Sequence, residues 1–473
     1  MQYASLHNHT CYSNLKLIDS INSVDGLIDY GYELGLYGIA ITDHDCLTAH
    51  IPAIKHFNKK YKNSERPYKL ILGNEIYVTR EGLCKETHQT GEKFYHCILL
   101  AKDTIGHEQL RKLSSRAWER SYMMAIMRTP TYLSDLDEIV GEDPGHLICT
   151  TACIGGFCGS KFLDERARAL QSLGYYGDPW DTMPTEKPTV GEIPAIDNYL
   201  RGMKALFGDD FYIELQPSYQ EDQIEYNNYM IGHYWNEYNF TIATDAHYLK
   251  KDEAKLHKDF LQSKESKGNR EVDSFYSSAY LMSAEEIVEY LQDYIPMAQI
   301  ETMFKNTLDI VDKCAGDYNL FHEQIVPKIE YEWSERDPEA FERMVDEINS
   351  YGDKYINLAP YFGKGANESD EYLAYLIAEG YYSGKVDCSE EYIARLDEEL
   401  YHIHAISERL NQPLSNYFNT MAKIMDIVWT DGDSIVGPGR GSGCGCLINY
   451  LVGITQLDPL RQELTMPFWR LTR

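Results

Sequence analysis

Up to about residue 285, the sequence alternates short apolar runs with amphipathic stretches. This alternation is typical of a parallel sheet whose strands are joined by helices. The apolar runs predict strands at 3–9, 38–43, 68–78, 95–102, 146–151, 211–215 and 240–244. Seven strand–helix units predict an α/β fold whose sheet curls into a closed or nearly closed barrel.

Helical spacing fills most gaps between these strands and dominates the rest of the chain. Helices are predicted first at 23–36, 49–61, 108–121, 198–207 and 225–238. The strand signal then fades, and helices are predicted at 284–291, 303–314, 338–351, 371–383 and 389–410. The stretch 175–193 is rich in Gly, Pro and acidic residues and predicts a loop. We therefore expect two domains, 1–285 and 286–473.

Metal-binding residue types lie at or near the end of nearly every predicted strand. His7 and His9 are one residue apart on the first strand, so their side chains point the same way. A lone histidine or cysteine is more often a core residue, but their joint placement at successive strand ends favours a metal site. The set is His7, His9, Asp19, His44, Glu75, His96, Cys153, Asp245 and His247.

Several motifs around these residues resemble a known family. They are SLHNHTCYS at 5–13, ITDH at 41–44, GNE at 73–75, YHCILLAK at 95–102, TTAC at 150–153, FYIELQ at 211–216 and ATDAHY at 243–248. Together they resemble the polymerase and histidinol phosphatase (PHP) domain. More narrowly, they resemble the version that opens bacterial C-family replicative polymerases, the DNA polymerase III alpha subunits.

The resemblance implies a distorted seven-stranded barrel whose mouth holds up to three metals on the nine residues named above. It also implies that His7, His9, His44, Asp245 and His247 are catalytic. The mixed imidazole, carboxylate and thiolate set suits two or three divalent ions of Zn, Mn or Fe. Clustered dications activate water for attack at phosphorus. In the polymerase context, this predicts 3′-to-5′ removal of nucleotides, that is, proofreading.

A glycine-rich segment near the end carries a second candidate site. VGPGRGSGCG, at 436–445, precedes an apolar run that could begin a helix, and such turns expose backbone N–H groups to phosphate. A flexible loop between helices is the simpler interpretation of this segment alone. With GITQLDP at 453–459 and RLDEEL at 395–400, it resembles the nucleotide-phosphate loop of the same family's palm. The predicted phosphate-binding residues are Gly439, Arg440, Gly441, Ser442 and Gly443.

The palm is expected to be incomplete, because the family's paired catalytic aspartates come after the Asp-Pro turn and the sequence stops first. Asp431 and Asp433 precede the glycine-rich segment and are interpreted as turn residues. We therefore expect no polymerisation by this chain alone. The expected partners are a DNA primer-template and a carboxyl-terminal polymerase fragment that carries the palm aspartates, thumb and fingers.

Composition limits the other classes of function. The formal net charge of −30 disfavours extended contact with nucleic acid, and composition alone favours an acidic enzyme with a small anionic substrate. The apolar runs are too short to cross a bilayer, no secretory signal is apparent, and the eleven cysteines suggest reduced thiols. A cytoplasmic location in a bacterial or phage-infected cell is expected.

Two further interpretations stay open. A free-standing PHP phosphatase would hydrolyse a small phosphomonoester and ignore DNA. Alternatively, the metals serve only to stabilise the fold of the barrel, and the chain is a catalytically silent scaffold for the rest of the polymerase.

Overall fold

The computed structural model describes residues 1–79, 94–123, 127–176, 184, 188–263, 274–321, 323–432 and 434–461. Contacts divide the chain into two compact units, Met1–Leu320 and Phe321–Arg473, and each is described by itself. Most of the predicted loop at 175–193 lies outside the described residues. Among the helices that the structure describes, none has the length and apolar character to cross a membrane.

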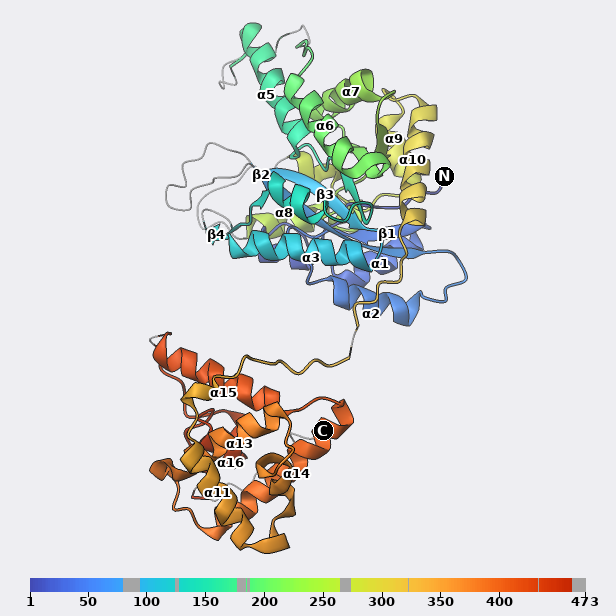
Figure 1. The fold of residues 1–473 in the computed structure, drawn as a ribbon. Coiled ribbons are helices and arrows are strands. Elements are labelled where there is room, and N and C mark those ends of the chain that lie inside the picture. Colours follow the sequence, from blue (N-terminus) through green and yellow to red (C-terminus); the bar gives the residue numbers. More distant parts are fainter. Residues whose placement is uncertain are drawn as a thin grey trace. The chain divides into compact units, whose positions relative to one another are not determined.

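The first unit is built on a curled, mixed sheet (Figure 1). Its strands, in spatial order, are β1 (Gly38–Ile41), β2 (Lys69–Thr79), β3 (Tyr95–Ala101), β7 (Leu147–Thr150), β8 (Phe211–Leu215) and β9 (Asn239–Ile242). The short β6 (Thr131–Tyr132) pairs with the end of β2. A separate hairpin joins β4 (Tyr122–Met123) to β5 (Met127–Arg128).

The amino-terminal segment connects the two edges of this sheet. Ser5 bridges Ile39 of β1, and Asn8 bridges Ala246, which follows β9. The prediction of a continuous strand at 3–9 was wrong, because only isolated bridges form there. The Asn8 side chain donates to the carbonyls of Ser5 and Ala40, at 3.1 and 3.0 Å, so side-chain bonds replace part of the ladder. The segment still completes the ring of seven that the sequence predicts.

Strand β3 departs from the expected parallel sheet. It runs antiparallel to both of its neighbours, β2 and β7, whereas β1–β2, β7–β8 and β8–β9 are parallel pairs. A parallel pair needs a crossover connection that is usually helical, and the sequence between β2 and β3 shows no helical spacing. The beginning of β3, and not its end, therefore lies at the end of the sheet where the other strands terminate.

Helices surround the sheet: α3 and α5 pack on β3, α6 packs on β7 and β8, and α10 packs on β9. The bounds are α1 (Val24–Glu33), α2 (His50–Lys60), α3 (Thr104–Glu119), α4 (Leu133–Ile139), α5 (Phe157–Ser172), α6 (Pro194–Phe207), α7 (Glu221–Tyr234), α8 (Ala254–Gln262), α9 (Ala284–Leu291) and α10 (Met297–Lys313). Ser23 caps α1 by accepting the N–H of Gly26.

The first unit extends past the expected domain boundary at 285. Ile310 and Val311 of α10 are fully buried in one apolar cluster with Ala40 of β1 and Ile71 of β2. The apolar face of α10 needs the sheet to cover it, so the helix belongs with the barrel. The boundary between the units follows Leu320.

The described part of the second unit is helical. Its elements are α11 (Pro338–Ser350), α12 (Ala359–Phe362), α13 (Glu368–Gly380), α14 (Glu390–Leu410), α15 (Ser415–Thr430) and α16 (Leu447–Leu451). Helix α13 contacts α11, α12, α15 and α16, and Leu373 and Ile377 on it are fully buried. At Gly380, an added Cβ would lie 2.2 Å from the carbonyl oxygen of Leu451, so α13 and α16 approach closely only because this residue is glycine.

Candidate metal centre

The structure brings all nine predicted ligands to one end of the sheet. Four of them follow the carboxyl end of a strand that is parallel to a neighbour, as a barrel mouth requires, and Glu75 lies within β2. His96 instead lies near the beginning of β3, which faces the same edge because β3 is reversed. The contributing segments are the amino-terminal segment (His7, His9), the loop after residues 11–15 (Asp19), the β1 end (His44), β2 (Glu75), β3 (His96), the β7 end (Cys153) and the β9 end (Asp245, His247).

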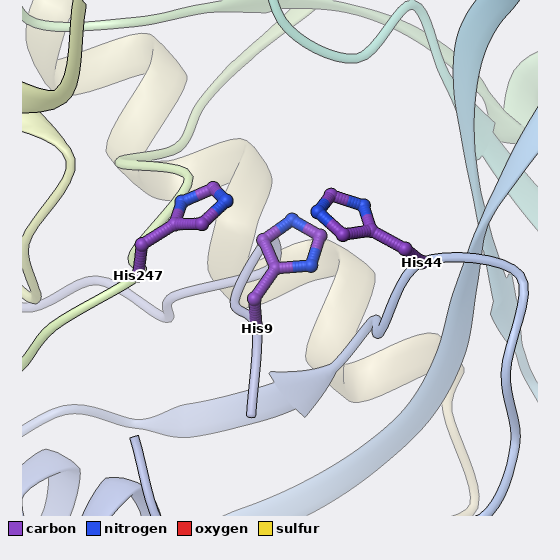
Figure 2. A group of neighbouring side chains, drawn as sticks. All are labelled: His9, His44 and His247. Carbon is purple, nitrogen blue, oxygen red and sulfur yellow. The ribbon is translucent and has the colours of Figure 1, made fainter. Parts of the chain in front are cut away.

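Three groups of ligand atoms each lie within 4.8 Å of one another. They are His9 with His44 and His247, His7 with His9 and Glu75, and Glu75 with His96 and Cys153. Figure 2 shows the first group, with the three imidazoles gathered from different segments. The ring centroids of His9 and His44 are 4.0 Å apart, and those of His9 and His247 are 4.5 Å apart. Shared residues make these groups one continuous cluster.

The two remaining carboxylates join the same cluster. Asp19 Oδ2 lies 3.0 Å from His44 Nε2 and 3.3 Å from His247 Nε2. Asp245 Oδ1 lies 3.2 Å from His7 Nε2 and 3.0 Å from His9 Nε2. These contacts place Asp19 against the imidazoles of the first group and Asp245 between both histidines of the His-x-His motif.

The cluster is buried, and its electrostatics depend on close pairing of opposite charges. Burial alone would lower the pKa of His44, but Asp19 and Glu75 raise it to about 10. Burial also tends to lower the pKa of His7. The negative charges of Asp245 and Glu214 outweigh this effect, so the pKa of His7 is raised well above its usual value. Burial, His44 and His247 instead lower the pKa of His9 to about 3. His9 is therefore a neutral imidazole with a lone pair to donate.

The donor set fits divalent cations. Asp19 Oδ1, Glu75 Oε1 and Asp245 Oδ1 are buried and accept no hydrogen bond from the described residues. His7 Nε2 and His9 Nε2 lie 3.2 Å apart. Two nitrogens on one zinc ion, at roughly 2.0–2.1 Å and a tetrahedral angle, stand about 3.3 Å apart. Buried oxygens without donors, beside closely facing ring nitrogens, are what a bound cation would satisfy.

Three residues at this end of the sheet have left-handed backbone although none is glycine. Asp45, Ala152 and Asp245 have φ of 48°, 57° and 49°. Each is a predicted ligand or directly adjacent to one, namely His44, Cys153 or Asp245 itself. Such a conformation costs of order 1 kcal/mol or more for a residue with a Cβ, and such strain is concentrated at functional sites.

The residues that contact these ligands from outside the cluster were not predicted from the sequence. Glu214 lies 2.7 Å from His7 Nδ1, Ser13 Oγ lies 3.1 Å from His9 Nδ1, and the Tyr276 hydroxyl donates to Asp19 at 3.3 Å. Glu214 and Ser13 stand inside quoted motifs, FYIELQ and SLHNHTCYS. A buried acidic residue inside an apolar strand was the available signal for Glu214.

The glycine-rich segment precedes a helix, as the sequence predicts, and its last five residues themselves form a helical turn. Gly441–Gly445 forms a short 3-10 helix, and α16 follows it. The backbone N–H groups of Leu447 and Ile448 donate to Glu399, at 2.7 and 2.9 Å, so the first amides of α16 already have an anionic partner. Phosphate binding by Gly439, Arg440, Gly441, Ser442 and Gly443 stays a prediction.

The two aspartates before this segment were interpreted as turn residues. Asp431 caps the carboxyl end of α15, and Asp433 lies outside the described residues.

Two family models match the chain. The PHP domain matches residues 5–218, and the model described as the bacterial DNA polymerase III alpha NTPase domain matches residues 371–471. The first match contains all the predicted ligands except Asp245 and His247. The second contains the glycine-rich segment, Glu399 and α16.

Individual relatives are similar along almost the whole chain. A probable DNA polymerase YorL of Bacillus subtilis and a DNA-directed DNA polymerase of Bacillus phage SPbeta are each 37% identical over 98% of this chain and 35% of their own length. A DNA polymerase III subunit alpha of Borreliella burgdorferi is 27% identical over 98% of this chain and 33% of its own. The chain thus spans about a third of the length of these relatives. A solved structure of a candidate metal-dependent phosphoesterase of Bifidobacterium adolescentis is 14% identical over 63% of this chain and 98% of its own, with a TM-score of 0.26.

Proposed function

Because the chain carries a PHP domain followed by a segment of the bacterial DNA polymerase III alpha family, we propose that its barrel hydrolyses phosphodiesters with divalent metals. The finer proposal is 3′-to-5′ exonuclease action on DNA, that is, proofreading. The observation that carries it is the meeting of nine imidazole, carboxylate and thiol ligands at one end of the sheet. The relatives are named as DNA polymerases, which supports DNA as the substrate.

The nine residues named in the sequence would hold two or three ions of Zn, Mn or Fe. When bound, such ions lower the pKa of water and neutralise charge on a phosphate group. The chain's own residues prepare this chemistry. His9 offers an unprotonated ring, and Asp19, Glu75 and Asp245 supply negative charge next to the imidazoles. Of the histidine ligands, only His96 is substantially exposed, at 25% of its side chain, so solvent reaches the cluster on the His96 side.

The proposal is tested with the full chain on a primer-template that has a 3′ mismatch, in the presence of Mn²⁺ or Zn²⁺. We expect stepwise shortening of the primer from its 3′ end, resolved on a denaturing gel. His9→Ala should abolish this shortening, because His9 belongs to two of the three ligand groups. His56→Ala is a matched control, because His56 pairs with Asp29 on the barrel's outer helices and contacts no predicted ligand.

The outcomes separate the open alternatives. Hydrolysis of p-nitrophenyl phosphate without any shortening of DNA would support a small-molecule phosphatase and overturn the nuclease. Bound metal without either activity would support a catalytically silent scaffold whose fold the metals stabilise. Shortening from a blocked 3′ end would show that the polarity is wrong.

We also propose that a polypeptide corresponding to the remaining length of the relatives is a partner of this chain, together with primer-template DNA. The net charge of −30 supports this proposal, because a chain so acidic gains little from phosphate contacts by itself. In a gel-shift experiment, we expect weak DNA binding by this chain alone that falls further as salt is raised.

A further inference from the structure

Both histidines of the His7–Asn8–His9 motif direct one ring nitrogen away from the cluster. His7 Nδ1 lies 2.7 Å from Glu214 Oε1. His9 Nδ1 lies 3.1 Å from Ser13 Oγ. A neutral imidazole carries its hydrogen on one nitrogen only. If the outer contact accepts a hydrogen bond from Nδ1, the hydrogen is on Nδ1, and the free lone pair is on Nε2.

Glu214 is buried among hydrogen-bond donors. Its Oε2 accepts the Thr150 hydroxyl at 2.6 Å, and its Oε1 accepts Nε2 of Gln216 at 3.2 Å. Only 1% of its side chain is exposed, so water cannot replace these partners. An ionised carboxylate only accepts hydrogen bonds, so the nitrogen of His7 that faces Glu214 carries the hydrogen.

Asp43 acts on His9 through Ser13. The Ser13 hydroxyl donates to Asp43 Oδ1 at 2.7 Å, and Asp43 also accepts the N–H and the hydroxyl of Thr10. The single hydroxyl hydrogen of Ser13 is thereby committed to Asp43. Ser13 Oγ can only accept from the ring of His9, so the His9 nitrogen on that side carries its hydrogen.

We propose that Glu214 and Asp43 are positioning residues that fix His7 and His9 in the tautomer whose unprotonated Nε2 faces the centre. The inference rests on the proposed metal centre and deepens it. In this tautomer, two lone pairs face one another across 3.2 Å, with Asp245 Oδ1 at 3.2 and 3.0 Å from them. Three electron-rich atoms so close together attract one cation, and the outer carboxylates hold each ring with its Nε2 directed toward that cation.

The test uses the full chain and Co²⁺, whose visible absorption reports the arrangement of its ligands. Glu214→Gln removes the charge that holds His7, and Ser13→Ala breaks the link from Asp43 to His9. Each should weaken Co²⁺ binding by roughly 10–100-fold and change the absorption bands. Asp135→Asn is the matched control. It is another buried carboxylate of the first unit, paired with Arg120 and in contact with no predicted ligand, so it should leave both readouts unchanged.

Each outcome decides the point. One outcome is that Glu214→Gln and Ser13→Ala bind Co²⁺ with unchanged affinity and absorption, while Asp245→Asn loses Co²⁺. That result would overturn the positioning role and leave the proposed site intact. If wild-type chain binds no Co²⁺, the metal centre itself fails, and this inference fails with it. Ser13→Ala leaves no buried charge without a partner. If Glu214→Gln does not fold, wild-type binding and absorption in Ser13→Ala alone would overturn the proposal.

Discussion

Buried carboxylates occur in both units, and their surroundings differ. In the second unit, Glu399 accepts the N–H groups of Leu447 and Ile448 and pairs with Arg395 at 2.8 Å. Both of its oxygens are bonded by the chain itself. In the first unit, Glu75 and Asp245 each keep a buried oxygen that accepts no hydrogen bond from the described residues.

This difference separates a buried carboxylate that stabilises the fold from buried carboxylates that could bind a cation. Burial of a carboxylate is tolerated when the protein supplies its donors, and Glu399 meets that condition. One oxygen of Glu75 and one of Asp245 do not, and the imidazoles beside them are themselves closely packed, with the ring centroids of His9 and His44 4.0 Å apart. We infer that Glu399 completes the second unit, whereas the cluster at the barrel is completed by cations from outside the chain.

The largest expected effect comes from removing one carboxylate of the barrel cluster. Asp245→Asn keeps the shape but removes the charge that lies between His7 and His9. Metal binding should weaken beyond the roughly 10–100-fold that outer contacts cost. Metal per chain, measured by elemental analysis after dialysis, checks this. The control is Asp29→Asn on α1, and an unchanged metal content in Asp245→Asn would show that the assigned ligands are wrong.

The next effect should appear in the second unit and leave metal binding untouched. Glu399→Ala leaves two buried N–H groups and the Arg395 guanidinium without their partner, which should reduce the free energy of unfolding by about 3 kcal/mol. Urea denaturation measures it. Glu398→Ala, at the exposed neighbouring position, is the control. Equal stability of the two variants, or loss of metal from Glu399→Ala, would contradict the comparison.

Metal addition should stabilise one region and not the other. A ligand at a hundredfold excess over its Kd stabilises the folded state by about 2.7 kcal/mol. Hydrogen exchange with Mn²⁺ should therefore slow in peptides that contain 5–13 and 243–248 and stay unchanged in those that contain 447–451. Asp245→Asn should remove the protection. Equal protection in both regions would mean that the stabilisation is not confined to the barrel.

A smaller effect is expected from a hydroxyl at the edge of the cluster. Tyr276→Phe removes the 3.3 Å bond to Asp19 and keeps a ring to pack against His247. A long bond of this kind should change metal affinity by less than about tenfold. Calorimetric titration measures it. Tyr61→Phe removes a comparable hydroxyl–carboxylate bond, to Asp29, and should have no effect. A loss as large as that of Asp245→Asn would place Tyr276 among the essential groups.

Elements with both a clear hydrophobic pattern and a terminal signal could be predicted from the sequence. Strand β8 and helix α9 have the predicted bounds, and Ser283 forms a capping box with Glu286 at the start of α9. Helix α15 was missed. It has no side-chain cap at Leu414, and exposed Ile424 and Ile427 obscure the amphipathic pattern.

Prediction of the cluster was possible because its residue types are rare in strands and recur at strand ends. Their assembly depends on the barrel, which periodicity also predicts. The outer contacts were not predictable, because the pairing of His7 with Glu214 joins residues that are 207 positions apart. No local pattern encodes such a distance. The reversal of β3 was missed for a different reason. The direction of a strand depends on its connection to the strand before it, and the lack of helical spacing between β2 and β3 was the available signal.

The joining of Asn8 to Ala246 has a consequence for synthesis of the protein. His9 donates its N–H to the Ala246 carbonyl at 2.9 Å, so a segment translated early is held by one of the last segments of the barrel. At about 5–20 residues per second, the nascent chain waits roughly ten seconds or longer between translation of His9 and of His247. During that interval, the imidazoles near the amino terminus are exposed to cellular metal without the carboxylate that accompanies them in the finished fold.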